Sequence, residues 1–271
     1  MQNRRTYLLD ADRVGVLIAS VLLTYALTRL VESPQYILRL NLPGFYYSYP
    51  ISLTTAMSMM AAGLTATGMD WLLRDHPGLG RKATVENWML PTLTTFVIGA
   101  PLALLPDGPS WWIGFGVGGI LLLGVFLAEY TVVEPSAAYY GLARAGLTAL
   151  AYALFLILVT ALRLAAIRMF LLVPVIFISA GLISLRILHL DGTDRWDFPW
   201  AVGIGLICSQ LGAGLHYWPL SPVQFGLALV GPLYALTTLS INLTENMPVG
   251  RAALGSAVLT GLAWLAAFFL H

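Results

Sequence analysis

The chain has 271 residues, of which 58% are hydrophobic and 10% are charged, and its mean hydropathy is +0.80. Soluble domains carry about 25% charged residues, so this composition excludes a water-soluble fold and indicates a chain that uses the lipid bilayer as its solvent. The formal net charge of +1 provides no basic field for nucleic acid, and the one cysteine, Cys208, excludes an internal disulfide.

Nine apolar segments follow one another along the chain, each about 17–23 residues long, which is the length that crosses roughly 30 Å of hydrocarbon as an α-helix. The first follows Arg4, Arg5 and Arg13 and is long enough for an uncleaved signal anchor. The sequence therefore predicts an all-α, polytopic transmembrane helical bundle of about nine helices, which forms a single integral membrane domain over residues 1–271. The segments are 14–31, 51–73, 88–105, 111–128, 141–162, 169–188, 200–216, 223–241 and 251–270.

Basic residues predict the orientation of this bundle. With the N-terminus in the cytoplasm, most of the 14 lysines and arginines lie in inner turns, as the positive-inside rule requires. The exceptions are Arg29, Arg39, Arg163 and Arg168. We therefore expect a multipass protein of the inner (plasma) membrane, with a cytoplasmic N-terminus. A misplaced turn between residues 163 and 168 would change both the helix count and every later orientation.

The first outer loop, residues 32–50, is unusually aromatic. Its aromatic residues are Tyr36, Phe45, Tyr46, Tyr47 and Tyr49. Tyrosine is enriched where the bilayer meets water, because the ring is apolar and the hydroxyl is polar. We expect this loop to lie flat in the interface and to anchor the chain there.

Small and polar residues predict how the helices pack. Gly114 and Gly118 have the GxxxG spacing that allows two helix backbones to approach closely. Two further stripes of small residues are Ser58, Ala62 and Ala66 in the second segment, and Ala253 and Ala257 in the ninth. Such stripes allow close approach inside the bundle or between protomers, and we expect the former because nine helices offer each other many faces. Gln210 and Asn242 are expected to form hydrogen bonds between helices. Ionisable groups such as Glu129 lie near predicted helix ends.

Two inner turns are rich in aspartate. The turn after the second segment holds Asp70 and Asp75, and the turn after the sixth holds Asp191 and Asp194. Paired carboxylates at a membrane surface have the chemistry to bind Mg²⁺, and the metal in turn to bind a diphosphate. The alternative is that these turns are simply solvated, with their basic residues fixing the topology.

This arrangement is similar to that of the intramembrane aromatic prenyltransferases, which have nine helices and aspartate-rich motifs in the inner loops after helices two and six. The resemblance implies Mg²⁺-dependent transfer of a prenyl chain. The sequence departs from the family pattern in both loops. Asp70 and Asp75 are five residues apart, where the family spacing is four, and no asparagine precedes them; in the second loop the spacing from Asp191 to Asp194 to Asp197 is three.

A broader resemblance involves the runs "NWMLPTLTTFVIGAPLALLP", "WWIGFGVGGILLLGVFLAEYTVVEP" and "HYWPLSPVQFGLALVGPLYALTTL". They resemble an uncharacterised family of bacterial multipass membrane proteins, and the resemblance implies an architecture but no catalytic residue. We therefore expect a membrane protein without an evident catalytic site, either an accessory subunit of a membrane assembly or a small-molecule carrier. Its expected partners are the lipid bilayer and other membrane subunits, and not nucleic acid. The alternative is a Mg²⁺-dependent, prenyltransferase-like enzyme that uses the four aspartates.

Overall fold

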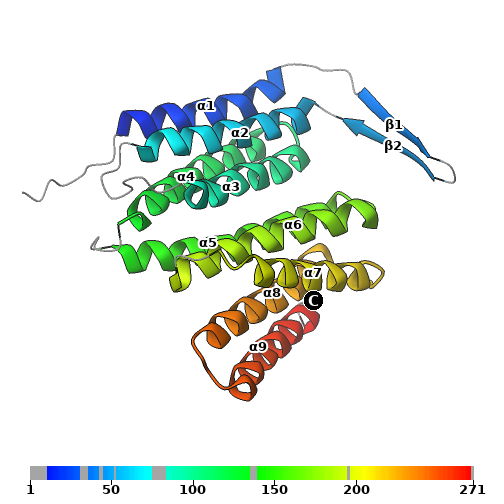
Figure 1. The fold of residues 1–271 in the computed structure, drawn as a ribbon. Coiled ribbons are helices and arrows are strands. Elements are labelled where there is room, and N and C mark those ends of the chain that lie inside the picture. The colour runs from blue at the N-terminus through cyan, green and yellow to red at the C-terminus, as the bar shows by residue number, and fades with distance from the viewer. Residues whose placement is uncertain are drawn as a thin grey trace, which may run out of the picture. The chain divides into compact units, whose positions relative to one another are not determined.

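The structure, a computed structural model, describes residues 11–30, 36–42, 45–51, 53–74, 84–134, 139–193 and 196–269. These residues form nine long helices and one β-hairpin (Figure 1). Each predicted apolar segment forms one helix whose ends lie within a few residues of the prediction, so the all-α bundle is confirmed. The helices are α1 (Ala11–Leu30), α2 (Leu53–Arg74), α3 (Val85–Leu104), α4 (Pro109–Val132), α5 (Tyr140–Leu164), α6 (Met169–Leu188), α7 (Phe198–His216), α8 (Pro222–Thr244) and α9 (Val249–Phe269).

Eight of these helices are long and apolar enough to cross a membrane, and α2 is the one that is not among them. Its sequence carries several serines and threonines, two of which, Ser58 and Thr65, are buried. Part of the lower hydropathy of α2 therefore comes from buried polar groups, while Thr67 and Arg74, which also lower it, are exposed. The short turn after α5 does separate two helices, as the sequence predicted.

Contacts divide the chain into two compact units, residues 1–137 and 138–271. In the N-terminal unit, α1 packs against α2 and α4, and α3 packs against the same two helices, so the four helices close into a ring. In the C-terminal unit, α6 pairs with α7, α8 pairs with α9, and α5 packs mainly against α8 (Figure 1). The prediction of a single integral membrane domain over residues 1–271 stays a prediction.

Buried hydroxyl groups link the helices of the N-terminal unit. The hydroxyl of Tyr25 on α1 donates to the carbonyl of Thr95 on α3 at 2.5 Å, and the hydroxyls of Thr65 and Thr95 are 2.8 Å apart. A Cβ atom at Gly99 would lie 2.6 Å from Oγ of Ser58, so glycine is needed for this approach. Between helices in lipid, such hydrogen bonds and close contacts replace the hydrophobic effect as the source of association.

The predicted close contact at Gly114 and Gly118 is an intramolecular contact of α4. A Cβ atom at Gly118 would lie 2.9 Å from the Ile98 side chain of α3, and one at Gly114 would lie 2.8 Å from Leu105. The packing prediction for this pair is therefore confirmed.

Two other packing predictions are wrong within the chain itself, whereas close approach of the α9 stripe to a second protomer stays a prediction. In α9 the stripe of Ala253 and Ala257 is exposed, and the buried small residues are Ala252 and Ser256, one position earlier. One residue is about 100° of rotation around a helix, enough to exchange the packed face for the lipid face. Gln210 is exposed on α7, and its side chain makes no hydrogen bond to another described residue.

A β-hairpin lies where a loop was expected. Strand β1 (Tyr36–Leu42) pairs antiparallel with β2 (Phe45–Ile51). Aromatic and branched residues favour strands, and the intervening Pro-Gly sequence favours a turn. By the register, alternate positions fall into two sets. One set includes Leu38, Leu40, Tyr47 and Tyr49, and the other includes Arg39, Asn41, Tyr46 and Ser48.

Candidate functional site

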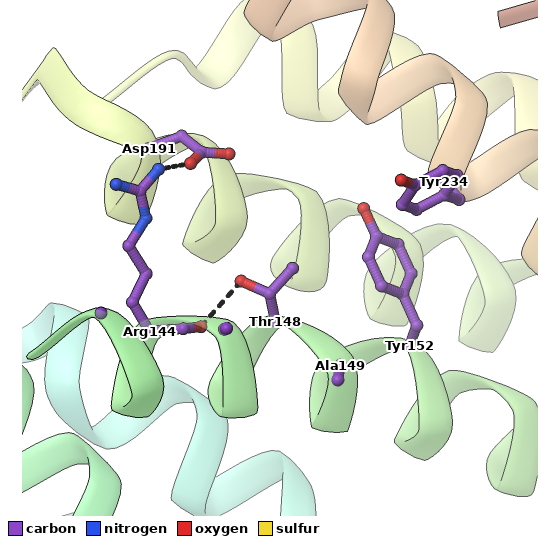
Figure 2. Close-up of a pocket in the computed structure, with 8 residues that line it drawn as sticks. Arg144, Thr148, Ala149, Tyr152, Asp191 and Tyr234 are labelled. Carbon is purple, nitrogen blue, oxygen red and sulfur yellow. Dashed lines mark hydrogen bonds and ion pairs between the residues drawn. The ribbon is translucent and has the colours of Figure 1, made fainter. Parts of the chain in front are cut away.

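An ion pair joins two elements at one end of the C-terminal unit. Arg144 lies about one turn inside the start of α5, and Asp191 lies in the π-helical turn η1 (His189–Thr193) that follows α6. The Arg144 guanidinium and the Asp191 carboxylate pair directly (Figure 2). The two side chains are 35% and 25% exposed, so both charges remain accessible.

A pocket of about 510 Å³ opens beside this ion pair. Helix α5 supplies most of its wall through residues on successive turns of one face, and η1 and α8 complete it (Figure 2). The lining residues are Gly141, Arg144, Ala145, Thr148, Ala149, Tyr152, Asp191 and Tyr234. Small side chains between the arginine and the tyrosine leave the space that forms the pocket.

Two tyrosines line the other end of this pocket. The rings of Tyr152 and Tyr234 meet edge to face, with centroids 5.3 Å apart. The Tyr152 hydroxyl lies 2.5 Å from Oγ1 of Thr237, and that threonine hydroxyl is also within 2.9 Å of the Leu233 carbonyl. A threonine hydroxyl has one proton, so when it bonds to the carbonyl, Tyr152 donates to Thr237. Tyr152 then keeps its own acceptor capacity.

The pocket is polar at one end and aromatic at the other. Tyr152 follows Arg144 by eight positions on α5, which corresponds to about 12 Å along a helix. Between them Ala145 and Ala149 present little more than methyl groups. Chemically, the pocket can receive a molecule that has a charged group joined to an apolar portion.

The structure describes two of the four aspartates predicted to bind Mg²⁺. Asp70 near the end of α2 accepts from Nε of Arg74 at 2.8 Å and from the Thr84 hydroxyl at 2.5 Å. Asp191 pairs with Arg144 in the other unit. Asp75 and Asp194 lie outside the described residues.

Among the described residues, no group of three or more histidine, cysteine, aspartate and glutamate side chains could hold a metal ion. Since two of the four predicted ligands are not described, the Mg²⁺ site stays a prediction. Asp70 and Asp191, the two predicted ligands that the structure describes, each pair with an arginine that a metal ion would have to replace.

A second polar contact lies inside the N-terminal unit. Glu129, in the last turn of α4, is fully buried, and Nδ2 of the buried Asn87 at the start of α3 donates to its carboxylate at 3.1 Å. The sequence located Glu129 near a helix end but did not reveal its burial or its partner. Two consecutive antiparallel helices bring the start of one beside the end of the other. This rule was the one feature from which a contact between Asn87 and Glu129 could have been predicted.

Sequence reasoning also missed Tyr152 and Tyr234 as pocket residues. The sequence feature that could have indicated the α5 wall of the pocket is a stripe of small residues with helical spacing, which starts at Gly141 and leads to Tyr152. No local signal connects that stripe with Tyr234 on α8.

The fold and the pocket define a helical protein with eight candidate membrane spans and an amphiphilic cavity in its C-terminal unit. The profile of one protein family matches residues 33–270. The chain belongs to this family, which is described as protein of unknown function (DUF5656), and the predicted resemblance to an uncharacterised family is thereby confirmed. No curated protein and no solved structure matches the chain.

Proposed function

We propose that this chain is a multipass protein of the bacterial inner membrane, with its N-terminus in the cytoplasm, that binds a small amphiphilic molecule in the pocket of its C-terminal unit. This is the carrier alternative of the sequence analysis. The observation that carries it is the pocket beside the Arg144–Asp191 pair, with Tyr152 and Tyr234 at its far end.

Three properties of the pocket support binding. Its volume lies within the range of about 300–1,000 Å³ that is usual for small-molecule sites. Its wall is mainly apolar with a few convergent polar groups, which is the usual composition of such sites. Its two charged side chains are partly exposed, so they are accessible to a ligand.

The competing explanation is that Arg144 and Asp191 only fasten η1 to the start of α5. An arginine presents five N–H donors in a planar fork, and the Asp191 carboxylate does not use all of them. Both side chains also line open space. A purely structural pair would need neither the adjoining cavity nor the small residues that create it.

Mg²⁺-dependent prenyl transfer is the enzymatic alternative. It would use Asp70, Asp75, Asp191 and Asp194, and it would first have to displace arginines from the two of these that the structure describes. It makes a distinct prediction, which is diphosphate binding that requires Mg²⁺ and is lost in Asp191→Ala.

Native mass spectrometry of the gently solubilised full chain tests these proposals. We expect one bound small molecule on the wild type, and its loss in Ala149→Phe, which fills the pocket without removing a charge. Leu142→Phe is the matched control, because Leu142 is on the same helix, is 73% exposed and does not line the pocket.

Equal ligand retention by both variants would overturn the pocket as the binding site. Co-purified protein subunits with no small molecule would support the accessory-subunit alternative instead. Binding of a prenyl diphosphate only with Mg²⁺ would support the enzyme.

A further inference from the structure

We infer that the pocket selects a zwitterionic lipid head group of the phosphoethanolamine type, with its phosphate on Arg144 and its ammonium on Asp191. This inference rests on the proposed function, and it adds the chemical class of the ligand. Three observations support it: the pocket has one charge of each sign, the two charges come from different elements, and an apolar wall continues along α5 from the ion pair.

Among the described residues, the lining of the pocket has one positive and one negative side chain, and their charges cancel. Arg144 and Asp191 pair with each other, both line the same space, and no other charged residue among those that the structure describes lines it. A ligand with a net charge would leave one of these two partly buried charges without its partner, and an unpaired charge that is partly removed from water is costly. A zwitterion leaves none.

The geometry of the two side chains suits the two ends of such a head group. The guanidinium fork binds phosphate oxygens through parallel N–H···O bonds, and a carboxylate accepts from a primary ammonium. Arg144 comes from α5 and Asp191 from η1, so the head group can enter between them without interrupting a helix (Figure 2). One internal ion pair is thereby exchanged for two with the ligand.

The rest of the wall fits the chains of the same lipid. Ala145, Thr148 and Ala149 continue along α5 from the ion pair and leave a groove that ends at the rings of Tyr152 and Tyr234. Arg144 to Tyr152 corresponds to about 12 Å along the helix, which is long enough for the glycerol region and the first carbons of an acyl chain. The groove therefore holds the head group of the lipid at the ion pair and its acyl chain towards the two tyrosines.

Competition between defined lipids tests the inference. The full chain in detergent is mixed with equal amounts of phosphatidylethanolamine and phosphatidylglycerol of the same acyl chains, and the bound fractions are measured by native mass spectrometry. We expect the wild type to prefer phosphatidylethanolamine by about tenfold, equivalent to about 1.4 kcal/mol. Asp191→Asn leaves a net positive pocket, so we expect its preference to reverse towards phosphatidylglycerol.

Two further variants keep the test interpretable. Arg144→Gln combined with Asp191→Asn removes both charges, and we expect it to bind either lipid without preference. Arg251→Gln changes an exposed arginine that does not line the pocket, and we expect it to behave as the wild type.

The failures of the two proposals are distinguishable. Lipid binding that is lost in Ala149→Phe but favours phosphatidylglycerol, or ignores the charge of the pocket, overturns the head-group inference alone. Binding that Ala149→Phe does not change overturns both the inference and the proposed function.

Discussion

The indole Nε1–H of Trp264 on α9 donates to the backbone carbonyl of Ala228 on α8 at 3.0 Å. Pro232 lies four residues after Ala228 within α8, and because proline has no N–H, this carbonyl lacks its helical donor. An unsatisfied carbonyl in hydrocarbon costs several kcal/mol. Trp264 therefore provides the hydrogen bond that the sequence of α8 removes, and it ties the last two helices together.

We expect Trp264→Phe to lower the free energy of unfolding by about 1 kcal/mol through the lost hydrogen bond, beyond its packing cost. Pro232→Ala restores an N–H to the helix, so the same tryptophan substitution should cost less in that background. Unfolding of all four proteins in mixed micelles with increasing SDS, followed by circular dichroism, measures this coupling. An equal cost in both backgrounds would show that the carbonyl does not depend on the indole.

The contact of α8 with α9 also depends on Gly231. A Cβ atom there would lie 2.3 Å from Cβ of Ala263, and neither atom can move without moving a helix. We expect Gly231→Ala to destabilise the chain by about 1–3 kcal/mol, seen as a lower thermal midpoint in detergent. Gly261→Ala on α9 is the control, because a Cβ at that position meets nothing within 4 Å. Equal midpoints for the two variants would contradict close packing at Gly231.

Arg163 at the end of α5 binds backbone carbonyls at the end of α7 and in the turn that follows it. Its Nη1 donates to the carbonyl of His216 at 2.8 Å, its Nη2 donates to the carbonyl of Trp218 at 3.2 Å, and its guanidinium lies over the ring of Phe225. Helix ends leave carbonyls without donors, and Arg163 satisfies that of His216; at the Trp218 carbonyl it adds a second donor beside the Leu220 N–H. We therefore expect Arg163→Gln to lower the free energy of unfolding by about 1.5–3 kcal/mol.

The SDS titration used for Trp264 also measures this loss. Arg163→Lys keeps the charge but not the fork, and it should lie between glutamine and the wild type. Arg251→Gln is the control for loss of an arginine elsewhere. A lysine variant as weak as the glutamine variant would point to the geometry of the fork, and one equal to the wild type would contradict the fork as the cause.

The number of crossings is testable because α2 is less apolar than its neighbours. If α2 crosses, cysteines placed at Ser48 and Asp107 should both react with an impermeant maleimide added to intact cells, and one at Glu134 should not. If α2 does not cross, Ser48 and Glu134 should react alike. The native Cys208 is fully buried and should contribute little background. We expect the first pattern, because the buried Ser58 and Thr65 pack α2 into a ring with three apolar helices.

The helices were predictable from sequence because their existence depends on the thickness of the bilayer, which a run of apolar residues must match. Which face of each helix packs against its neighbours was harder to predict. In α9, Ala252 and Ser256 have the same spacing as Ala253 and Ala257, and only the contact with α8 decides which pair is buried. The hairpin was missed because Tyr and Leu also suit an interfacial loop, and strand pairing adds only a local alternation to that pattern.

The pocket could not be predicted because its walls come from distant parts of the chain. Tyr152 and Thr237 are 85 residues apart in sequence, and the local sequence around one residue does not predict its contact with the other. Asp191 was singled out from its acidic turn, but its arginine partner on α5 was not. Charge in a membrane protein can be located from sequence, whereas its partner depends on which helices become neighbours.

The contact between α5 and α8 has a consequence for how the protein is made. Helices enter the membrane one after another as the ribosome releases them, and α6 and α7 emerge between these two partners. For that interval α5 must stay in the membrane without the neighbour that covers it most. The cavity beside Arg144 consequently lacks the part of its wall that Tyr234 provides until α8 arrives, so the pocket is completed only after three further helices have entered the membrane.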